Sequence, residues 1–231
     1  MPKSYKITYV DKFNSSSIQE STILFEAQMY LPDVPPGPQT EIRKARDKIK
    51  ILDFTKYIIL HEMEENVYGR ISNQSFHKYI RKETIFAYHS ESESLFLLSG
   101  KKKFVIDFCK KTKDSNDILI STINVNMSSL LTKLPSVKGV WFRFSNGLIR
   151  ASALMGSNID STMDFQKYKS VGDISTLSFL YEFGEVLHSI MVTNDGAIVL
   201  YENYKEISDE IEIILDIDKN LLKDIYTKVS I

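Results

Sequence analysis

The fold of this chain is decided by residues 175–203, which read STLSFLYEFGEVLHSIMVTNDGAIVLYEN. Three runs within this stretch, 175–183, 186–193 and 197–203, have the length and the apolar content of β-strands. A Gly-Glu pair joins the first two runs, and an Asn-Asp-Gly triplet joins the last two. Because Asn, Asp and Gly tolerate the positive φ angles of tight hairpin turns, the stretch predicts an antiparallel meander.

The segment before the meander predicts two more strands. It holds GVWFRF at residues 139–144, an Asn-Gly turn at 146–147 and another apolar run at 148–154. Successive side chains of a strand point to opposite faces of the sheet. We therefore expect Trp141 and Arg143 on one face, and Phe142 and Phe144 on the other.

The N-terminal half also predicts strands and one long loop. Alternation or apolar content indicates strands at 4–11, 21–31, 57–60, 67–71, 94–98 and 117–125, with a turn at Glu64-Glu65-Asn66. Residues 32–38 hold four of the six prolines, and proline cannot donate a ladder hydrogen bond. We interpret 32–38 as an extended surface loop.

Helices are predicted at fewer places. Apolar spacing at 103–113 indicates an amphipathic helix, and 128–134 and 161–169 indicate short ones. Residues 41–50 are either a short helix capped by Thr40 or an irregular linker. The tail at 210–217 fits both a period of two and a period of 3.6, and we predict a strand there, followed by a C-terminal helix capped by Asp218.

These elements predict an α+β fold with mainly antiparallel sheet(s), a C-terminal meander and a few short amphipathic helices. A chain of 231 residues is long enough to bury a substantial core. We predict a single globular domain, with a division into lobes 1–100 and 101–231 as the alternative.

Composition narrows the classes of protein. The net charge is −1, far from the basic balance of a dedicated nucleic-acid binder. A single cysteine, Cys109, excludes an intramolecular disulfide and a zinc site with two thiolates. No apolar run has a membrane span's length and the first residues do not resemble a secretory signal, so a cytoplasmic protein with no membrane partner is expected. Lysine outnumbers arginine 23 to 6, which is typical of an AT-rich bacterial or phage genome.

Catalytic and cofactor motifs are incomplete throughout the sequence. No glycine-rich phosphate loop and no Gly-x-Ser-x-Gly elbow is present, so no cofactor is predicted. His61-Glu62 resembles the start of a zincin helix but lacks the second histidine. Two groups keep a metal-dependent nuclease open as a weak hypothesis: Asp160 with Asp164, and His89 with Glu91 and Glu93. Capping of a helix and ordinary surface polarity explain these groups more simply.

Clusters of basic residues predict a nucleic-acid site as an alternative. The clusters are Lys101, Lys102, Lys103, Lys110, Lys111 and Lys113; Arg43, Lys44, Arg46, Lys48 and Lys50; and Lys78, Arg81 and Lys82. Converging lysines would bind phosphates. Solvated surface is the simpler explanation for each cluster.

The remaining hypothesis is a protein interface at Trp141 and Arg143, since an exposed Trp–Arg pair on a strand is typical of interface hot spots. A core tryptophan beside a surface arginine is the alternative. We therefore predict a non-catalytic interaction or regulatory protein of a bacterium or phage that binds a protein partner, either itself or another subunit. A role in phage–host conflict, such as antiviral defence, or in a mobile element is the expected setting.

Overall fold

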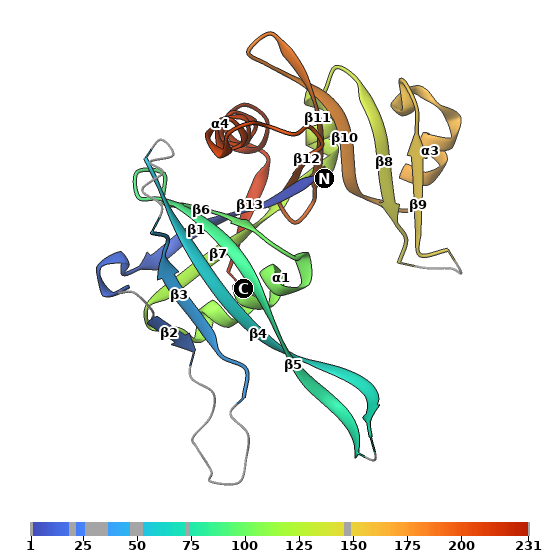
Figure 1. Cartoon of the computed structure of the whole chain (residues 1–231). Helices are drawn as coiled ribbons and strands as arrows, with labels where there is room; N and C mark the ends of the chain where they lie inside the picture. Colours follow the sequence, from blue (N-terminus) through green and yellow to red (C-terminus); the bar gives the residue numbers. More distant parts are fainter. Residues whose placement is uncertain are drawn as a thin grey trace. The chain divides into compact units, whose positions relative to one another are not determined.

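The computed structural model describes residues 2–18, 22–25, 37–46, 53–72, 74–145 and 149–230, and the chain divides into two compact units (Figure 1). We name them by their larger segments. The C-terminal unit contains Met1–Ile7 and Thr122–Val229. The N-terminal unit contains Thr8–Ser121 with Ser230–Ile231.

The N-terminal unit is built on a sheet whose strands follow the order β2-β3-β4-β5-β6-β1. One helix, α1, follows β6, and the glycine at 100, where the sequence suggested a division into lobes, lies between them. The bounds are β1 Lys3–Phe13, β2 Thr22–Phe25, β3 Thr40–Lys44, β4 Phe54–Ile71, β5 Gln74–Ser90, β6 Leu95–Ser99 and α1 Lys102–Lys111.

A row of isoleucines explains why this sheet forms. Ile42 of β3 pairs with Ile59 of β4, which pairs with Ile85 of β5, and all three are fully buried. The buried side chains of α1, among them Phe104 and Phe108, belong to the same core. An apolar stripe on the helix therefore closes one face of the sheet.

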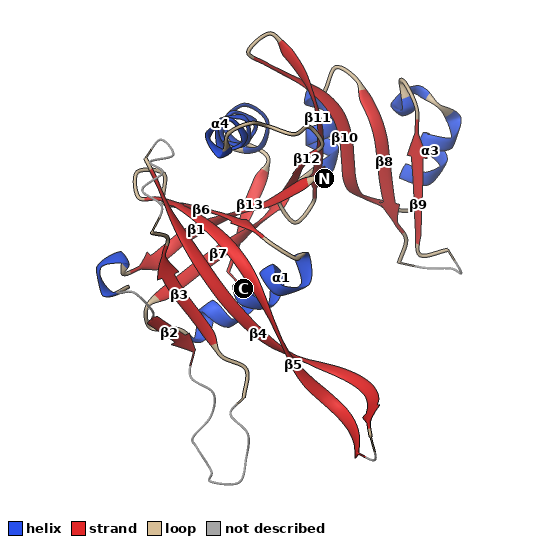
Figure 2. Ribbon diagram, viewed as in Figure 1, coloured by secondary structure: helices blue, strands red, loops and turns tan. Residues whose placement is uncertain are grey.

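Two strands of this unit form a long hairpin. β4 and β5 pair from Phe54↔Ser90 to Ile71↔Gln74, well past the part of β4 that pairs with β3. Figure 2 shows this hairpin extending away from its sheet. The turn predicted at Glu64-Glu65-Asn66 is wrong, because these residues lie inside β4 and pair with β5.

The antiparallel strand order continues from β1, which both units share, into the C-terminal unit as β12-β11-β10-β8-β9, and we call this part the C-terminal sheet. Strand β7 pairs with both β1 and β13, and its first residues, Ile118–Ser121, belong to the N-terminal unit. The bounds are β7 Ile118–Val125, α2 Met127–Lys133, β8 Val137–Arg143, β9 Ala151–Met155, α3 Met163–Lys169, β10 Asp173–Phe183, β11 Val186–Thr193, β12 Ala197–Leu200, α4 Ile207–Ile217, a π-helical turn Asp218–Leu222 and β13 Tyr226–Ser230.

Helices cover one face of the C-terminal sheet. On α3, Phe165 packs against Phe142 of β8, with ring centroids 5.7 Å apart. On α4, Asp216 accepts a hydrogen bond from Tyr181 of β10. The core residues of this face come from successive strands and include Val140, Phe142, Leu177, Phe179, Ile190, Val192, Ile198 and Leu200.

The prediction of a mainly antiparallel α+β fold is confirmed, and three further local predictions are wrong. The C-terminal helix expected after Asp218 is a π-helical turn, Asp218–Leu222, followed by strand β13. The helix at 41–50 is absent from its described part, since Thr40–Lys44 is β3, in which Thr40 and Ile42 point inward. Residues 210–217 belong to α4 rather than to a strand, because the helix buries Ile211, Ile213, Ile214 and Ile217. Residues 32–36, 47–52 and 146–148 lie outside the described residues.

Within the described ranges, none of the helices has the length and apolar character needed to cross a membrane.

Candidate protein-interaction surface

The second face of the C-terminal sheet lies on the side away from α3 and α4. The alternation that buries Phe142 and Val140 on the core side places Trp141 on the opposite side, where the register aligns it with Ala153 of β9 and Thr176 of β10. We call this side the open face. Its larger apolar side chains, from the edge strand inward, are Met155, Trp141, Leu180, Leu187, Met191, Val199 and Tyr201.

Several of these side chains are largely exposed. Met155 is 71% exposed, Leu187 60% and Tyr201 44%, while Trp141 is half-buried. Tyr201 donates its hydroxyl to the sulfur of Met191 at 3.5 Å, so the two side chains contact each other on this face. Small residues separate the large ones, including Gly139, Ala151 and Ala153.

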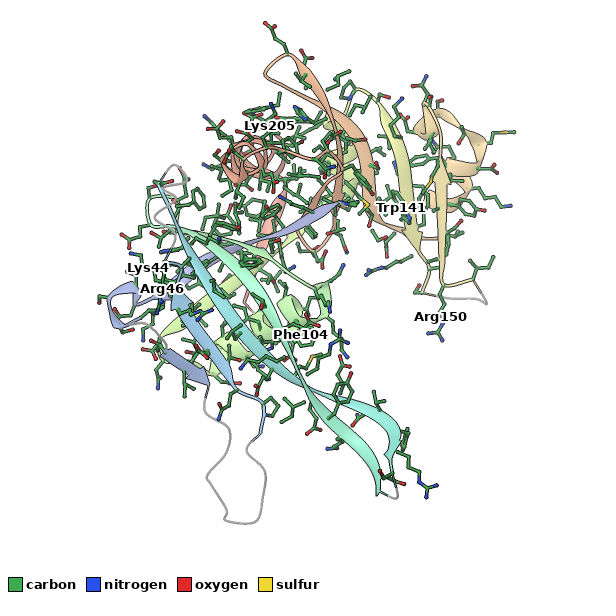
Figure 3. The ribbon with its side chains drawn as sticks, in the orientation of Figure 1. Lys44, Arg46, Phe104, Trp141, Arg150 and Lys205 are labelled. Carbon is green, nitrogen blue, oxygen red and sulfur yellow. The ribbon has the colours of Figure 1, made fainter. Side chains whose placement is uncertain are left out.

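Gly139 determines the position of the tryptophan. A Cβ atom at residue 139 would come within 2.9 Å of the Trp141 ring, so the ring lies directly over the glycine on the same strand face. Arg143 follows two residues later and is exposed. The arrangement expected for Trp141 and Arg143 on one strand face is therefore present, and Figure 3 shows Trp141 on β8.

Two lysines at the N-terminal end of α1 are engaged by acids of the β4–β5 hairpin. Lys101 pairs with Glu83, and Lys103 lies 3.2 Å from Glu65. Lys111 pairs with Asp107 of its own helix at 3.2 Å. Half of the predicted lysine cluster thus already has a carboxylate partner.

The hairpin cluster is neutralised in the same way. Lys78 pairs with Glu64 at 2.7 Å, Lys82 with Glu62 at 3.5 Å, and Arg81 contacts both Glu65 and Glu83. Glu65 lies 38 residues from Lys103 in sequence, so spacing along the chain did not indicate that pair.

Several other basic residues of the predicted clusters are exposed to solvent. Arg43, Lys44 and Arg46 are exposed, and no ion pair involves them within the described residues. Lys110 and Lys113 are also exposed. Lys48 and Lys50 lie outside the described residues. Figure 3 marks Lys44 and Arg46 on the N-terminal unit.

A buried polar chain joins three elements of the N-terminal unit, and the sequence did not indicate it. Thr40 Oγ1 lies 2.7 Å from His61 Nδ1, and His61 Nε2 lies 3.0 Å from Asp107 Oδ2. Burial lowers the pKa of His61, although the hydrogen bond that His61 donates to Asp107 opposes this shift. A neutral imidazole with its proton on Nε2 satisfies both contacts.

The order hydroxyl, imidazole, carboxylate has the connectivity of a catalytic triad. Thr40 is only 1% exposed and His61 has no exposed surface, so no substrate reaches the hydroxyl in this conformation. The chain therefore fastens α1 to β3 and β4.

Neither predicted metal group is assembled. No cluster of three or more His, Cys, Asp or Glu side chains suited to a metal ion occurs in the described ranges. His89 packs its ring against Phe13 and Phe96, with centroids 4.8 and 4.6 Å away, while Glu91 and Glu93 lie in the exposed turn that follows. Asp160 and Asp164 are both exposed, and the cap of α3 is Thr162, whose side chain accepts from the Phe165 amide.

A cavity of about 490 Å³ lies in the C-terminal unit where β7, α2 and β13 meet. Its walls include Asn124, Asn126, Asp224 and Tyr226. The Asn126 side-chain oxygen already caps α2 by accepting from the Ser129 amide.

Comparison of the chain with protein-family models and with curated proteins finds no match.

Proposed function

We propose that this protein is a non-catalytic interaction protein, with a regulatory role, that binds a protein partner through the open face of its C-terminal sheet. The observation that carries the proposal is the set of exposed apolar side chains on that face, with Met155, Leu187 and Tyr201 each more than two-fifths exposed. Extended apolar patches on soluble proteins usually mark interaction sites.

The residue types on the face also support a protein partner. Aromatic residues, methionine and arginine are enriched at protein interfaces, and this face carries Trp141, Tyr201, two methionines and Arg143. Trp141 is held by the strand and by its contact over Gly139, so binding would immobilise few additional rotamers. We assign it the role of hot spot, with Arg143 beside it.

Nucleic-acid binding is the second candidate, supported by one observation. Arg43, Lys44 and Arg46 are exposed and lack an ion pair in the described part of the chain, so they remain available to phosphates. The α1 cluster supports this candidate less, because Lys101, Lys103 and Lys111 are paired with carboxylates.

Comparative affinity purification from a native host tests the main proposal. Wild type, Trp141→Ala and Leu187→Glu would serve as baits, with Val171→Glu as matched control because Val171 is 65% exposed in the turn before β10. We expect a protein that the wild type and the control retain and that both open-face variants lose. Its purified form should bind Trp141→Ala at least tenfold more weakly, in line with hot-spot losses of about 2 kcal/mol.

The proposal fails if every captured protein is retained equally by all four baits. Retention on single-stranded DNA that falls with salt and is lost in Arg43→Glu with Arg46→Glu would instead favour the second candidate. The setting in phage–host conflict stays a prediction from composition.

A further inference from the structure

Strand β9 forms an edge of the C-terminal sheet. It is the last strand of the order and pairs with β8 alone within the described chain. Phe144 donates to the Arg150 carbonyl at 3.0 Å, and Gly156 donates to the Lys138 carbonyl at 3.0 Å. Since hydrogen-bonded and non-hydrogen-bonded pairs alternate in an antiparallel ladder, Ser152 and Leu154 also bond towards β8. The amides and carbonyls of Ala151, Ala153 and Met155 therefore point away from the sheet.

This edge lacks the features that usually prevent strand pairing. Exposed edges are commonly protected by charged side chains, proline or bulges. The strand reads Ala-Ser-Ala-Leu-Met from 151 to 155, with no charge and no proline, and its register with β8 is regular. The nearest charge along the chain is Arg150, which Figure 3 shows at the end of β9.

The sequence of β9 is complementary to itself in an antiparallel arrangement. A two-fold axis at Ala153 pairs Ala151 of one copy with Met155 of the other, and Ser152 with Leu154. On both faces of the sheet a large side chain would then lie across from a small one. The three outward residues of each copy would exchange amide-to-carbonyl hydrogen bonds, as isologous symmetry requires.

Charge does not oppose this arrangement. The two copies of Arg150 would sit at opposite ends of the paired strands, roughly 20 Å apart at the usual rise per residue. That separation exceeds the Debye length of about 8 Å at physiological ionic strength. Each Arg150 would face the segment around Gly156 of the other copy, four residues before the exposed Asp160.

The pairing also extends the open face. Ala153 lies beside Trp141 in the register, so the central row would read Trp141, Ala153, Ala153, Trp141 across the two copies. Three strand spacings would separate the two β8 strands by about 14 Å. The exposed Met155 of each copy would lie over Ala151 of the other and lose much of its exposure.

We propose that two copies of this chain associate by antiparallel pairing of β9 with β9, centred on Ala153, to form one sheet with a continuous open face. The inference rests on the proposed function, because it names a second copy as a partner of the sheet that carries the open face. It adds the partner, the register and the symmetry of the contact.

Analytical ultracentrifugation of the full chain tests the association. We expect a concentration-dependent dimer for the wild type and at least a tenfold weaker association for Ala153→Pro, which removes an outward amide without touching the bonds to β8. Ala153→Ser keeps the amide and should dimerise as the wild type does. Circular dichroism and the emission of Trp141 report whether each variant is folded.

Cysteine cross-linking tests the register. Hydrogen-bonded antiparallel pairs have Cα atoms about 5.5 Å apart, which is within disulfide range. With an added oxidant, Ala153→Cys alone should cross-link, as should Ala151→Cys mixed with Met155→Cys. Ala151→Cys alone should not, because its two copies would be roughly 13 Å apart. Cys109 is buried and stays in place as the common background.

The outcomes separate this inference from the proposed function. The β9 pairing is overturned if the wild type stays monomeric over a 100-fold range of protein concentration. It is also overturned if the wild type forms a dimer that Ala153→Pro leaves intact. If Leu187→Glu still abolishes capture of a partner in that case, the proposed function stands without the dimer. Conversely, the chain could dimerise through β9 while no captured protein is lost in Leu187→Glu. That result would support the β9 pairing and contradict the proposed function.

Discussion

Glu210 is an acidic side chain with no exposed surface, near the start of α4. Its carboxylate accepts hydrogen bonds from Lys3 and from the buried Tyr5 hydroxyl, both on β1 in the same unit. A buried carboxylate is tolerated only when such partners satisfy it. The contact therefore fastens α4 to β1 through two residues about 200 positions away in sequence.

Glu210→Ala leaves the Tyr5 hydroxyl buried without its acceptor. We expect a loss of about 2–4 kcal/mol in the free energy of unfolding, measured by urea denaturation. Glu210→Gln keeps an acceptor for Tyr5 and should lose less. Equal losses for the two variants would contradict the role given to the Tyr5 contact.

The buried His89 side chain should make the stability of the fold depend on pH. Burial lowers its pKa below the usual 6.5, more than Glu91 and Asp53 raise it. The folded state therefore binds fewer protons than the unfolded state. The contribution of His89 to the free energy of unfolding is complete above the pKa of His89 in the unfolded chain, and it is lost as the pH falls below that pKa. We expect a lower urea midpoint at pH 5.5 than at pH 7.5. His89→Phe, which keeps a ring among Phe13 and Phe96, should show a smaller drop; an unchanged drop would exclude His89 as a source.

At the scale of elements, α1 and the β4–β5 hairpin are joined by charge. Lys101→Glu with Lys103→Glu would place new acids beside Glu83 and Glu65, and we expect a lower urea midpoint at low salt that recovers partly at high salt. Lys113→Glu is the control, since Lys113 is exposed just beyond α1. A control that loses as much would show that the loss comes from net charge rather than from these pairs.

The fluorescence emission of Trp141, on strand β8, reports on the open face. Gly139→Ala introduces a Cβ atom 2.9 Å from the only tryptophan, so the Trp141 ring must move. Overpacking of this kind costs about 1–3 kcal/mol. We expect a shift of the tryptophan emission maximum in the folded protein together with a lower unfolding midpoint. An unchanged emission spectrum would mean that the ring does not lie over residue 139.

For the whole molecule, two strands supply hydrogen bonds to both units. In β1, Lys3 to Lys6 pair with β12, whereas Val10 donates to Ser94 at 2.8 Å. In β7, Val125 donates to Asn194 at 2.8 Å, whereas Ser121 donates its hydroxyl to Asp11. Unfolding of either unit therefore removes order from strands that the other uses.

Each unit contains one natural probe of unfolding. Trp141 reports on the C-terminal unit, and the buried thiol of Cys109 reports on the N-terminal unit. We expect the tryptophan emission and the reactivity of Cys109 to change over the same range of urea, because the shared strands couple the two transitions. Transitions with clearly separate midpoints would show that the units unfold independently.

Local patterns were reliable where turn chemistry and alternation agreed. The run at 186–193 has the bounds of β11, and alternation put Trp141 opposite the buried Phe142. They failed where charge or β-branching masked the period. Charged residues at 41–44 hid the inward alternation of Thr40 and Ile42, and the isoleucines at 211–217 fitted either period until packing selected the helix.

The sequence by itself determined the fold class and the two faces of β8, because both depend on local periodicity. Only the tertiary structure decided which charges are available. Lys103 and Glu65, or Thr40, His61 and Asp107, meet because distant elements pack together, and spacing along the chain carries no trace of such contacts. The same holds for the open face: alternation predicts that a strand has two sides, but only the packing of α3 and α4 shows which side of this sheet is covered and which side carries Trp141.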